Sequence, residues 1–292
     1  MTVKGLEKNT TYFYRVLSQE VKELRAYRPV MGSVVSTDIW KKPLTFTTLD
    51  MVNDIHGNNE LQKKLLGMAP PQDFDMVLFC GDMCSHINRQ NDIFTSFLNT
   101  SIELFATQKP FVYARGNHET RGAYARNFSR YFAGPNGKFY YAFTYGPVRF
   151  IVLDCGEDKP DTDVEYSGLI DFDSYMLEQK DWLSREIDNP EFKNASYRVV
   201  ISHMPFTKGG WYGSERLREQ LLPLLEQAQI DLMLSGHEHA FGFTDKGNAA
   251  SFPIIVNSNN SVLTLFASNH SLKVQVKQED GKILLEKEFQ KQ

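Results

Sequence analysis

Five short apolar segments along this 292-residue chain are each followed at once by a cluster of polar residues. The clusters contain five of the seven histidines, together with carboxylate and amide side chains. Imidazole and carboxylate together suit zinc, iron and manganese, whereas oxygen ligands alone would suit calcium or magnesium. The clusters are Asp54-Ile55-His56-Gly57, Gly81-Asp82, Gly116-Asn117-His118-Glu119, the single His203, and Gly236-His237-Glu238-His239.

The fold must bring these clusters together, because they are spread over residues 54–239. In open α/β sheets the ligand crevice lies at the carboxyl ends of the strands, so we expect all five clusters to converge there. A carboxylate such as that of Asp82 can bridge two ions that lie about 3.5–4 Å apart. No cluster is diagnostic alone, since a lone His203 is more often a hydrogen-bonded core histidine. The combination predicts a metal site.

The pattern of apolar residues predicts alternating strands and helices from about residue 50 onward. Such alternation indicates an α/β fold, and the β-rich end of the chain indicates a second sheet. Helices are expected at 58–68, 93–105, 174–187 and 214–227, and strands at 74–80, 110–114, 139–145, 148–154, 197–202 and 230–235, with four more after Gly242.

The first 48 residues have a different character. Residues 10–17 and 44–49 resemble strands, and the stretch between them is irregular. Two or three strands cannot close a sheet alone. We therefore interpret 1–48 as the end of a β-sandwich module or as a β-appendage, and 49–292 as the main domain.

Composition excludes two classes of function. The formal net charge is −4, from 36 acidic and 32 basic residues, so no basic face for nucleic acid is expected. The chain has no run of 18 apolar residues, so no membrane-spanning helix is expected. The first residues lack the apolar core of a signal peptide, and whether N-terminal residues are missing is left open. The oligomeric state is left open.

The ordered set of motifs resembles the calcineurin-like metallophosphoesterases over roughly residues 46–245. The front end, NTTYFYRV followed by FTT, is similar to the close of the fibronectin type III-like domain of purple acid phosphatases. The resemblance implies a four-layer α/β/β/α sandwich of two mixed sheets, with a short N-terminal β segment.

The resemblance also implies a centre of two divalent or trivalent ions, iron, manganese or zinc. His118 would lie close to the substrate without binding metal and would donate a proton to the leaving group. The implied ligands are Asp54, His56 and His239 for the first ion, Asn117, His203 and His237 for the second, and Asp82 as the bridge.

Two positions depart from the purple acid phosphatases. Those enzymes have Gly at the position of His56 and a metal-binding Tyr at the position of Ser85. Asp-Ile-His-Gly and the run that begins at Arg115 instead resemble protein Ser/Thr phosphatases. Those enzymes carry Asp at the Ser85 position, where it orients the catalytic His, and Arg at the position of His86. The partner that orients His118 therefore stays open, and a protein-phosphatase activity is disfavoured.

The resemblance implies hydrolysis of a small phosphorylated substrate, most simply a phosphomonoester, by a metal-bound hydroxide that attacks phosphorus. A phosphodiesterase of the cyclic-nucleotide or phospholipid type is the alternative, and a non-catalytic scaffold is a remote one. Export is slightly favoured by the resemblance. The acidic loop 157–163 is expected to face solvent. Candidate substrate contacts are His86, Arg121, Trp211 and Tyr212.

The colour of purple acid phosphatases arises from a tyrosinate bound to ferric iron. Because Ser85 stands at the tyrosine position, we expect the metal-loaded protein to lack this absorption. A visible spectrum of the iron-loaded protein checks the prediction, and a strong tyrosinate–iron band would contradict it.

Overall fold

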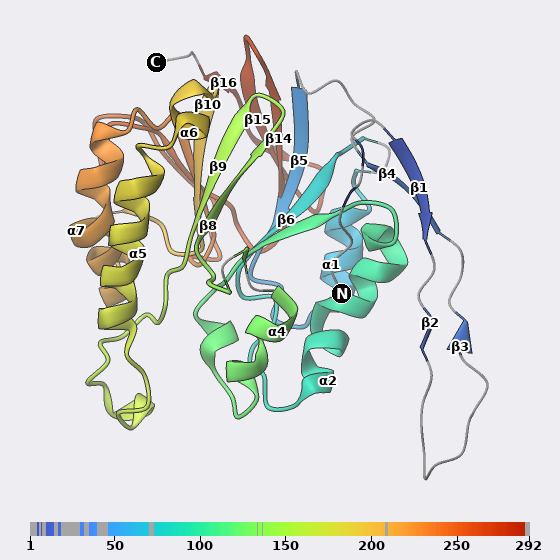
Figure 1. Cartoon of the computed structure of the whole chain (residues 1–292), viewed down its shortest axis with the longest axis horizontal. Helices are drawn as coiled ribbons and strands as arrows, with labels where there is room; N and C mark the ends of the chain where they lie inside the picture. The colour runs from blue at the N-terminus through green and yellow to red at the C-terminus, as the bar shows by residue number, and fades with distance from the viewer. Residues whose placement is uncertain are drawn as a thin grey trace.

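The computed structural model describes residues 48–69, 73–132, 134–135, 137–207 and 210–289, together with Gly5, Glu7 and the backbone of the strands before residue 48. Two six-stranded mixed sheets face each other, and helices cover their outer faces (Figure 1). The expected four-layer α/β/β/α sandwich is therefore confirmed. No helix in these described ranges is both long and apolar enough to cross a membrane.

The first sheet has the order β16-β15-β14-β5-β6-β7. Its first three strands in chain order run parallel to one another, and the three C-terminal strands join them in antiparallel fashion. The strands are β5 (Phe46–Val52), β6 (Met76–Cys80), β7 (Phe111–Ala114), β14 (Ser261–Ser268), β15 (Leu272–Gln278) and β16 (Ile283–Phe289).

The second sheet has the order β12-β13-β11-β10-β9-β8. Its four inner strands are parallel and its two edge strands antiparallel. The strands are β8 (Tyr141–Tyr145), β9 (Val148–Leu153), β10 (Tyr197–Ser202), β11 (Leu232–Ser235), β12 (Gly242–Thr244) and β13 (Ile254–Val256).

The N-terminal segment forms two short antiparallel pairs, β1 (Thr10–Tyr14) with β4 (Val35–Ile39), and β2 (Leu17–Ser18) with β3 (Val30–Met31). The strand expected at 44–49 is β5, which lies inside the first large sheet between β14 and β6. The boundary at 48/49 thus falls within a strand of the main domain. A separate N-terminal module stays a prediction.

Apolar helix faces cover the outer side of each sheet (Figure 1). Leu65 and Phe97 lie in the cluster behind the first sheet, and Met176 and Leu221 lie in the cluster behind the second. The helices are α1 (Asn59–Leu66), the continuous stretch 90–106, which includes α2 (Gln90–Ile93) and α3 (Asn99–Ser101), and α4 (Ser129–Phe132) on one side, and α5 (Phe172–Glu186), α6 (Pro190–Asn194) and α7 (Tyr212–Gln227) on the other.

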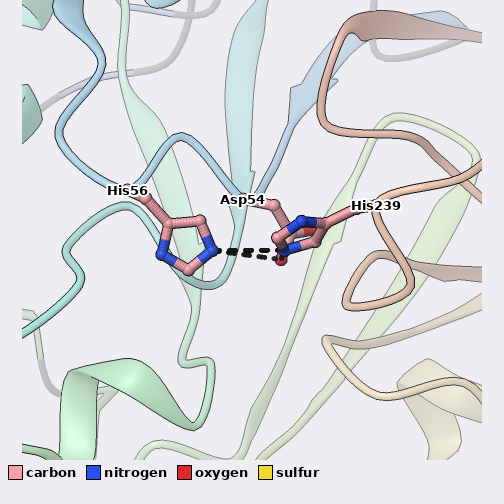
Figure 2. Close-up of side chains that lie close together, drawn as sticks. All are labelled: Asp54, His56 and His239. Atoms are coloured by element: carbon pink, nitrogen blue, oxygen red, sulfur yellow. Dashed lines mark hydrogen bonds and ion pairs between the residues drawn. The ribbon is translucent and has the colours of Figure 1, made fainter.

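Both sheets present the carboxyl ends of their parallel strands at the same end of the molecule. The loop after β5 and the loop after β11 meet there, and they bring the side chains of Asp54 and His239 together (Figure 2). A buried ion pair ties the sheets beside this edge, since Arg115 after β7 donates to Asp154 after β9 at 2.5 Å. The edge is therefore where both halves of the fold contribute side chains.

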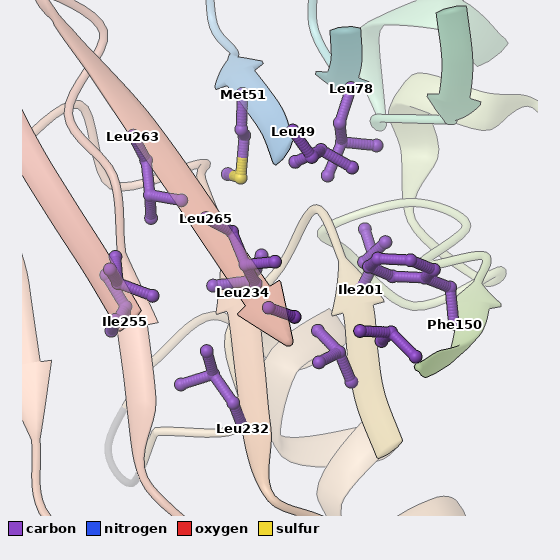
Figure 3. Packing of buried hydrophobic residues seen from close by; sticks show 14 of the residues in the cluster. Leu49, Met51, Leu78, Phe150, Ile201, Leu232, Leu234, Ile255, Leu263 and Leu265 are labelled. Carbon is purple, nitrogen blue, oxygen red and sulfur yellow. The ribbon is translucent and has the colours of Figure 1, made fainter. Parts of the chain in front are cut away.

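The main core lies between the two sheets (Figure 3). Alternate residues of each strand point into it, as expected for strands whose side chains alternate between the two faces. The buried residues drawn there include Leu49, Met51 and Leu265 of the first sheet and Phe150, Ile201 and Leu234 of the second.

Leu265 and Phe266 are adjacent on β14 and face opposite sides. Leu265 is fully buried, whereas Phe266 is 38% exposed. We expect Leu265→Ala to lower the free energy of unfolding by about 2–5 kcal/mol, because it leaves a cavity between the sheets. Phe266→Ala is the control and should cost clearly less. Denaturant unfolding measures both, and equal losses would contradict the placement of the core.

Candidate metal centre

The five polar clusters converge as expected, each from the end of a parallel strand. Asp54 follows β5, Asp82 follows β6 and Asn117 lies just beyond β7, all in the first sheet. His203 follows β10 and His237 lies just beyond β11 of the second sheet. Ligand atoms lie within 4.8 Å of one another in three groups, Asp54 with His56 and His239, His56 with Asp82 and His118, and Asp82 with His203 and His237.

Asp82 lies at the middle of these groups. Its Oδ2 is 3.1 Å from His203 Nε2, 3.9 Å from His118 Nε2 and 4.0 Å from His56 Nε2. Its Oδ1 accepts a hydrogen bond from the backbone N–H of His118 at 3.0 Å. Burial raises the pKa of Asp82, but His203 and His118 outweigh burial and hold that pKa well below its usual range. The carboxylate is therefore charged, although it is almost fully buried.

Asp54 faces two imidazole rings (Figure 2). Its Oδ1 is 3.3 Å from His239 Nε2 and 4.0 Å from His56 Nε2. The two Nε2 atoms are themselves only 3.2 Å apart. Two ring nitrogens that face each other at this distance need a proton or a cation between them, because their lone pairs repel. The two imidazoles are therefore placed to share one cation or one proton.

His203 is fully buried, and its Nδ1 donates to the carbonyl of Cys80 at 2.7 Å. Such a contact fixes the ring so that Nε2 faces a metal. Burial lowers the pKa of His203, but Asp82 and Asp54 raise it to about 10. The pKa of His237, in contrast, is lowered to about 4 by burial and by the charge of His203. Metal ions that bind here would take the place of protons.

Four buried atoms of the site that could ligate a metal make no hydrogen bond with the described residues, although two of them, Asp54 Oδ1 and His203 Nε2, lie within ion-pair distance of a partner. Nearly all buried polar atoms in proteins are paired, so such a cluster requires an explanation. Their mixture of nitrogen and oxygen donors suits zinc, iron or manganese, and the residues present therefore fit a metal centre. The atoms are Asp54 Oδ1, Asn117 Oδ1, His203 Nε2 and His237 Nε2.

The backbone at this edge is strained. Among the residues that the structure describes, seven other than glycine have positive φ angles, and five of them belong to the site. Each such residue costs of order 1 kcal/mol or more and persists only where its surroundings fix it. The five are Asp54 (54°), His56 (49°), Asp82 (55°), His237 (73°) and His239 (53°).

Two glycines allow the loops to approach one another. A Cβ atom on Gly81 would lie 2.4 Å from His203 Nδ1, and one on Gly116 would lie 2.1 Å from Asp82 Oδ1. Neither distance is possible for a real side chain. These glycines are therefore required by contacts between loops that are far apart in the sequence.

Glu119 has a structural role that the sequence did not reveal. It is fully buried and accepts hydrogen bonds from the backbone N–H groups of Asp82 at 2.9 Å, Cys84 at 3.0 Å and Gly116 at 2.9 Å. Burial and the charge of Asp82 both raise the pKa of Glu119. This carboxylate fastens the loop after β6 to the loop after β7. The sequence shows only that Glu119 follows His118.

The partner that orients His118 is a backbone group. Its Nδ1 donates to the carbonyl of Ser85 at 2.9 Å, at the position where the resemblance left the partner open. The His118 ring lies 4.7 Å from the ring of His56 and 6.1 Å from the ring of His86. His86 is exposed, so it lies at the rim of the site.

Arg121 lies beside His118 and is paired with acidic residues. Its Nε and Nη2 donate to the two carboxylate oxygens of Glu157 at 3.1 and 2.8 Å, and Nη2 also reaches Asp158 at 3.1 Å. Glu157 is buried, so the expectation that the acidic loop 157–163 faces solvent is wrong at this residue. Burial is possible because Arg121 neutralises the carboxylate.

Two aromatic residues lie at the start of α7. Trp211 is 51% exposed, and its ring centroid is 5.9 Å from that of His237. Tyr212, the first residue of α7, is 43% exposed. The structure thus places Trp211 next to a candidate metal ligand, with the adjacent Tyr212 at the surface.

Residues 47–241 match the family described as calcineurin-like phosphoesterase. Probable purple acid phosphatase 20 of Arabidopsis thaliana is 24% identical over 263 residues, which cover 82% of this chain and 54% of that protein. Purple acid phosphatase 1 of Ipomoea batatas is 22% identical over 283 residues, covering 87% and 53%. The chain spans about half the length of these curated relatives.

Three solved structures share the fold. A purple acid phosphatase from yellow lupin (Lupinus luteus) seeds has a TM-score of 0.72 at 16% identity, over 98% of this chain and 60% of that one. A dimetal phosphatase from Danio rerio has a TM-score of 0.63 at 15% identity, over 86% and 100%. GAP50, the anchor in the inner membrane complex of Plasmodium, also scores 0.63, at 16% identity over 85% and 90%. The chain belongs to the calcineurin-like phosphoesterase family, in its purple acid phosphatase-like branch.

Proposed function

We propose that this protein hydrolyses phosphoric monoesters at a dinuclear metal centre. The observation that carries the proposal is the set of buried ligand atoms that converge around the Asp82 carboxylate, of which Asn117 Oδ1 and His237 Nε2 have no hydrogen-bond partner among the described residues. A buried carboxylate with imidazole neighbours is unfavourable unless cations compensate it. The family, whose members include phosphatases, supports the reaction class.

We assign two sets of ligands from the three groups of neighbouring atoms. Asp54, His56 and His239 form one set. His203 and His237 form the other, completed by the buried amide oxygen of Asn117. Asp82 would bridge, because its Oδ2 is within 4.0 Å of both His203 and His56. The mixed donors favour iron, manganese or zinc.

The bound ions would supply a water of lowered pKa and neutralise charge on the phosphoryl group. His118 presents Nε2 to the centre, because Nδ1 is occupied by the Ser85 carbonyl. Nε2 is thus the atom at which His118 would take up a proton and pass it to the leaving group, a role worth about 10²–10⁴-fold. His86, Trp211 and Tyr212 form an exposed rim that is suited to contact the substrate.

Two further functions remain as alternatives. A phosphodiesterase would use the same ligands and differ in the ester it prefers. A scaffold is also compatible with this fold, since GAP50, an anchor, shares it. Six of the seven candidate ligands lie in groups of neighbouring ligand atoms, the seventh, Asn117, has a buried amide oxygen, and five of the seven adopt strained backbone conformations. We therefore favour catalysis.

The ligand assignment predicts the metal content. The protein should bind two ions per chain, and His237→Ala should lower that number toward one, because it removes a donor from the second set. His270→Ala is the matched control, since His270 is exposed and outside the site. Elemental analysis of the purified variants measures the content. Two ions retained in His237→Ala would remove His237 from the ligand set.

The monoesterase proposal predicts a preference between two chromogenic esters. The metal-loaded protein should hydrolyse p-nitrophenyl phosphate with a higher kcat/KM than bis-p-nitrophenyl phosphate. His270→Ala should show the same ratio. Initial rates measured over a range of concentrations of each ester give the two kcat/KM values. A preference for the bis ester would support the diesterase, and two bound metals without turnover of either ester would support the scaffold.

A further inference from the structure

We propose that Arg121 is a positioning residue that aims the His118 ring, and that Glu157, Asp158 and Tyr166 hold Arg121 for this purpose. The catalytic consequence rests on the proposed function. The alternative role for Arg121, which the sequence suggested, is direct contact with the phosphate of the substrate. A positioning role requires the guanidinium group to stay bound to protein partners, whereas phosphate binding requires it to be free for the substrate. The contacts in the structure distinguish these two roles.

The guanidinium group of Arg121 is already engaged along one side. Nε and Nη2 form a fork to both oxygens of the Glu157 carboxylate, at 3.1 and 2.8 Å. Nη2 makes a further contact with Asp158 Oδ1 at 3.1 Å. Bidentate pairs of this kind fix the plane of the guanidinium group as well as its position. The guanidinium group of Arg121 is therefore fixed in place by two carboxylates.

Glu157 makes it costly for Arg121 to leave. The side chain of Glu157 is only 2% exposed, so its carboxylate would be buried without its cation if Arg121 turned to a phosphate. Removing one partner of a buried ion pair is strongly destabilising, because the remaining charge is uncompensated. This argues against direct phosphate binding by Arg121.

The remaining terminal nitrogen of Arg121 meets His118. Nη1 lies 3.2 Å from His118 Nε2. Arginine can only donate, so Nε2 of the neutral ring accepts in the free protein, and this bond must open when Nε2 takes up the leaving-group proton. The other ring nitrogen, Nδ1, donates to the Ser85 carbonyl at 2.9 Å. The ring is thus held at both nitrogens, in one orientation and one tautomer, beside Asp82.

The carboxylates that hold Arg121 are themselves anchored. The hydroxyl of Tyr166 donates to Glu157 Oε2 at 3.0 Å and lies 3.2 Å from Asp158 Oδ1. The backbone N–H of Gly213, at the start of α7, donates to the Asp158 carbonyl at 3.3 Å. The loop after β9 is therefore fixed to α7 and reaches across to His118.

Glu157→Gln separates the two roles, because it weakens the hold on Arg121 without changing Arg121 itself. If Arg121 positions His118, the kcat for p-nitrophenyl phosphate should fall roughly 10- to 100-fold, the loss expected for a misplaced catalytic group. KM and the inhibition constant of inorganic phosphate should change by less than about two-fold, since the metal ligands that meet the phosphate are intact. If Arg121 binds phosphate, its release should tighten phosphate inhibition, and that result would overturn the proposal.

Arg121→Lys should act in the same direction as Glu157→Gln, because a lysine cannot reproduce the fork or reach His118 at the same time. Tyr166→Phe is a milder variant that keeps the ion pair, and it should lower kcat less. The matched control is Arg149→Lys. Arg149 is also buried and paired with two glutamates, at 2.6 Å to Glu186 and 2.5 Å to Glu191, but at the beginning of β9. It should leave kcat unchanged.

A spectroscopic measurement tests the positioning without any turnover. Long-range proton–nitrogen correlations of the full chain, with and without diamagnetic zinc, report the tautomer of His118. We expect a single tautomer with the proton on Nδ1, and mixed tautomers in Arg121→Lys. An unchanged His118 signature in that variant would overturn the inference. If the wild-type protein hydrolyses neither ester, the proposed function fails, while this signature still decides the role of Arg121.

Discussion

The structure depends on the electrostatics of one buried carboxylate. Asp82 is almost fully removed from water and yet remains charged, with its Oδ2 3.1 Å from His203. A buried charge is tolerated only when opposite charges and hydrogen bonds compensate it. Here the compensation comes from imidazoles contributed by both sheets and, we propose, from two metal ions. The fold can be understood as the means of assembling these partners around a single residue.

That requirement explains the architecture of the carboxyl edge. The stacking of the two mixed sheets brings His203 and Asp82 together, because each follows a strand of a different sheet. The loops then adopt left-handed backbone conformations that sequence-local forces would not choose. Glu119 holds two of these loops through three backbone N–H groups. The strain is thus balanced by buried hydrogen bonds that lie directly behind the site.

The same edge also links the site to its surroundings. The buried pair of Arg115 and Asp154 joins the sheets, and Gly156 N donates to Asp154 Oδ1 at 3.2 Å. Glu157 follows immediately and holds Arg121, which contacts His118. A series of polar contacts, connected through the peptide bond between Gly156 and Glu157, therefore runs from the sheet interface to the proposed proton-transfer group. We propose that these residues act by orienting the His118 ring, because the contacts of Arg121 restrict the movement of its guanidinium group.

The sequence by itself determined the α/β alternation, the presence of a second sheet and the candidate ligand types, because apolar periodicity and rare histidines at strand ends are local signals. The stacking of the two sheets was implied by the family resemblance. Asp54, Asp82 and His203 could be selected as candidates from such signals, and the resemblance then assigned each of them to a ligand set. Only the tertiary structure decided that residues 46–49 belong to a central strand, that the Ser85 carbonyl orients His118, and that Glu157 is buried. The physical reason is twofold. Every residue has the same backbone carbonyl, so the sequence does not show which carbonyl will orient His118. The two members of a long-range ion pair are not spaced at any regular interval, so the sequence does not show which residues will pair. Such partners become visible only when the chain is folded.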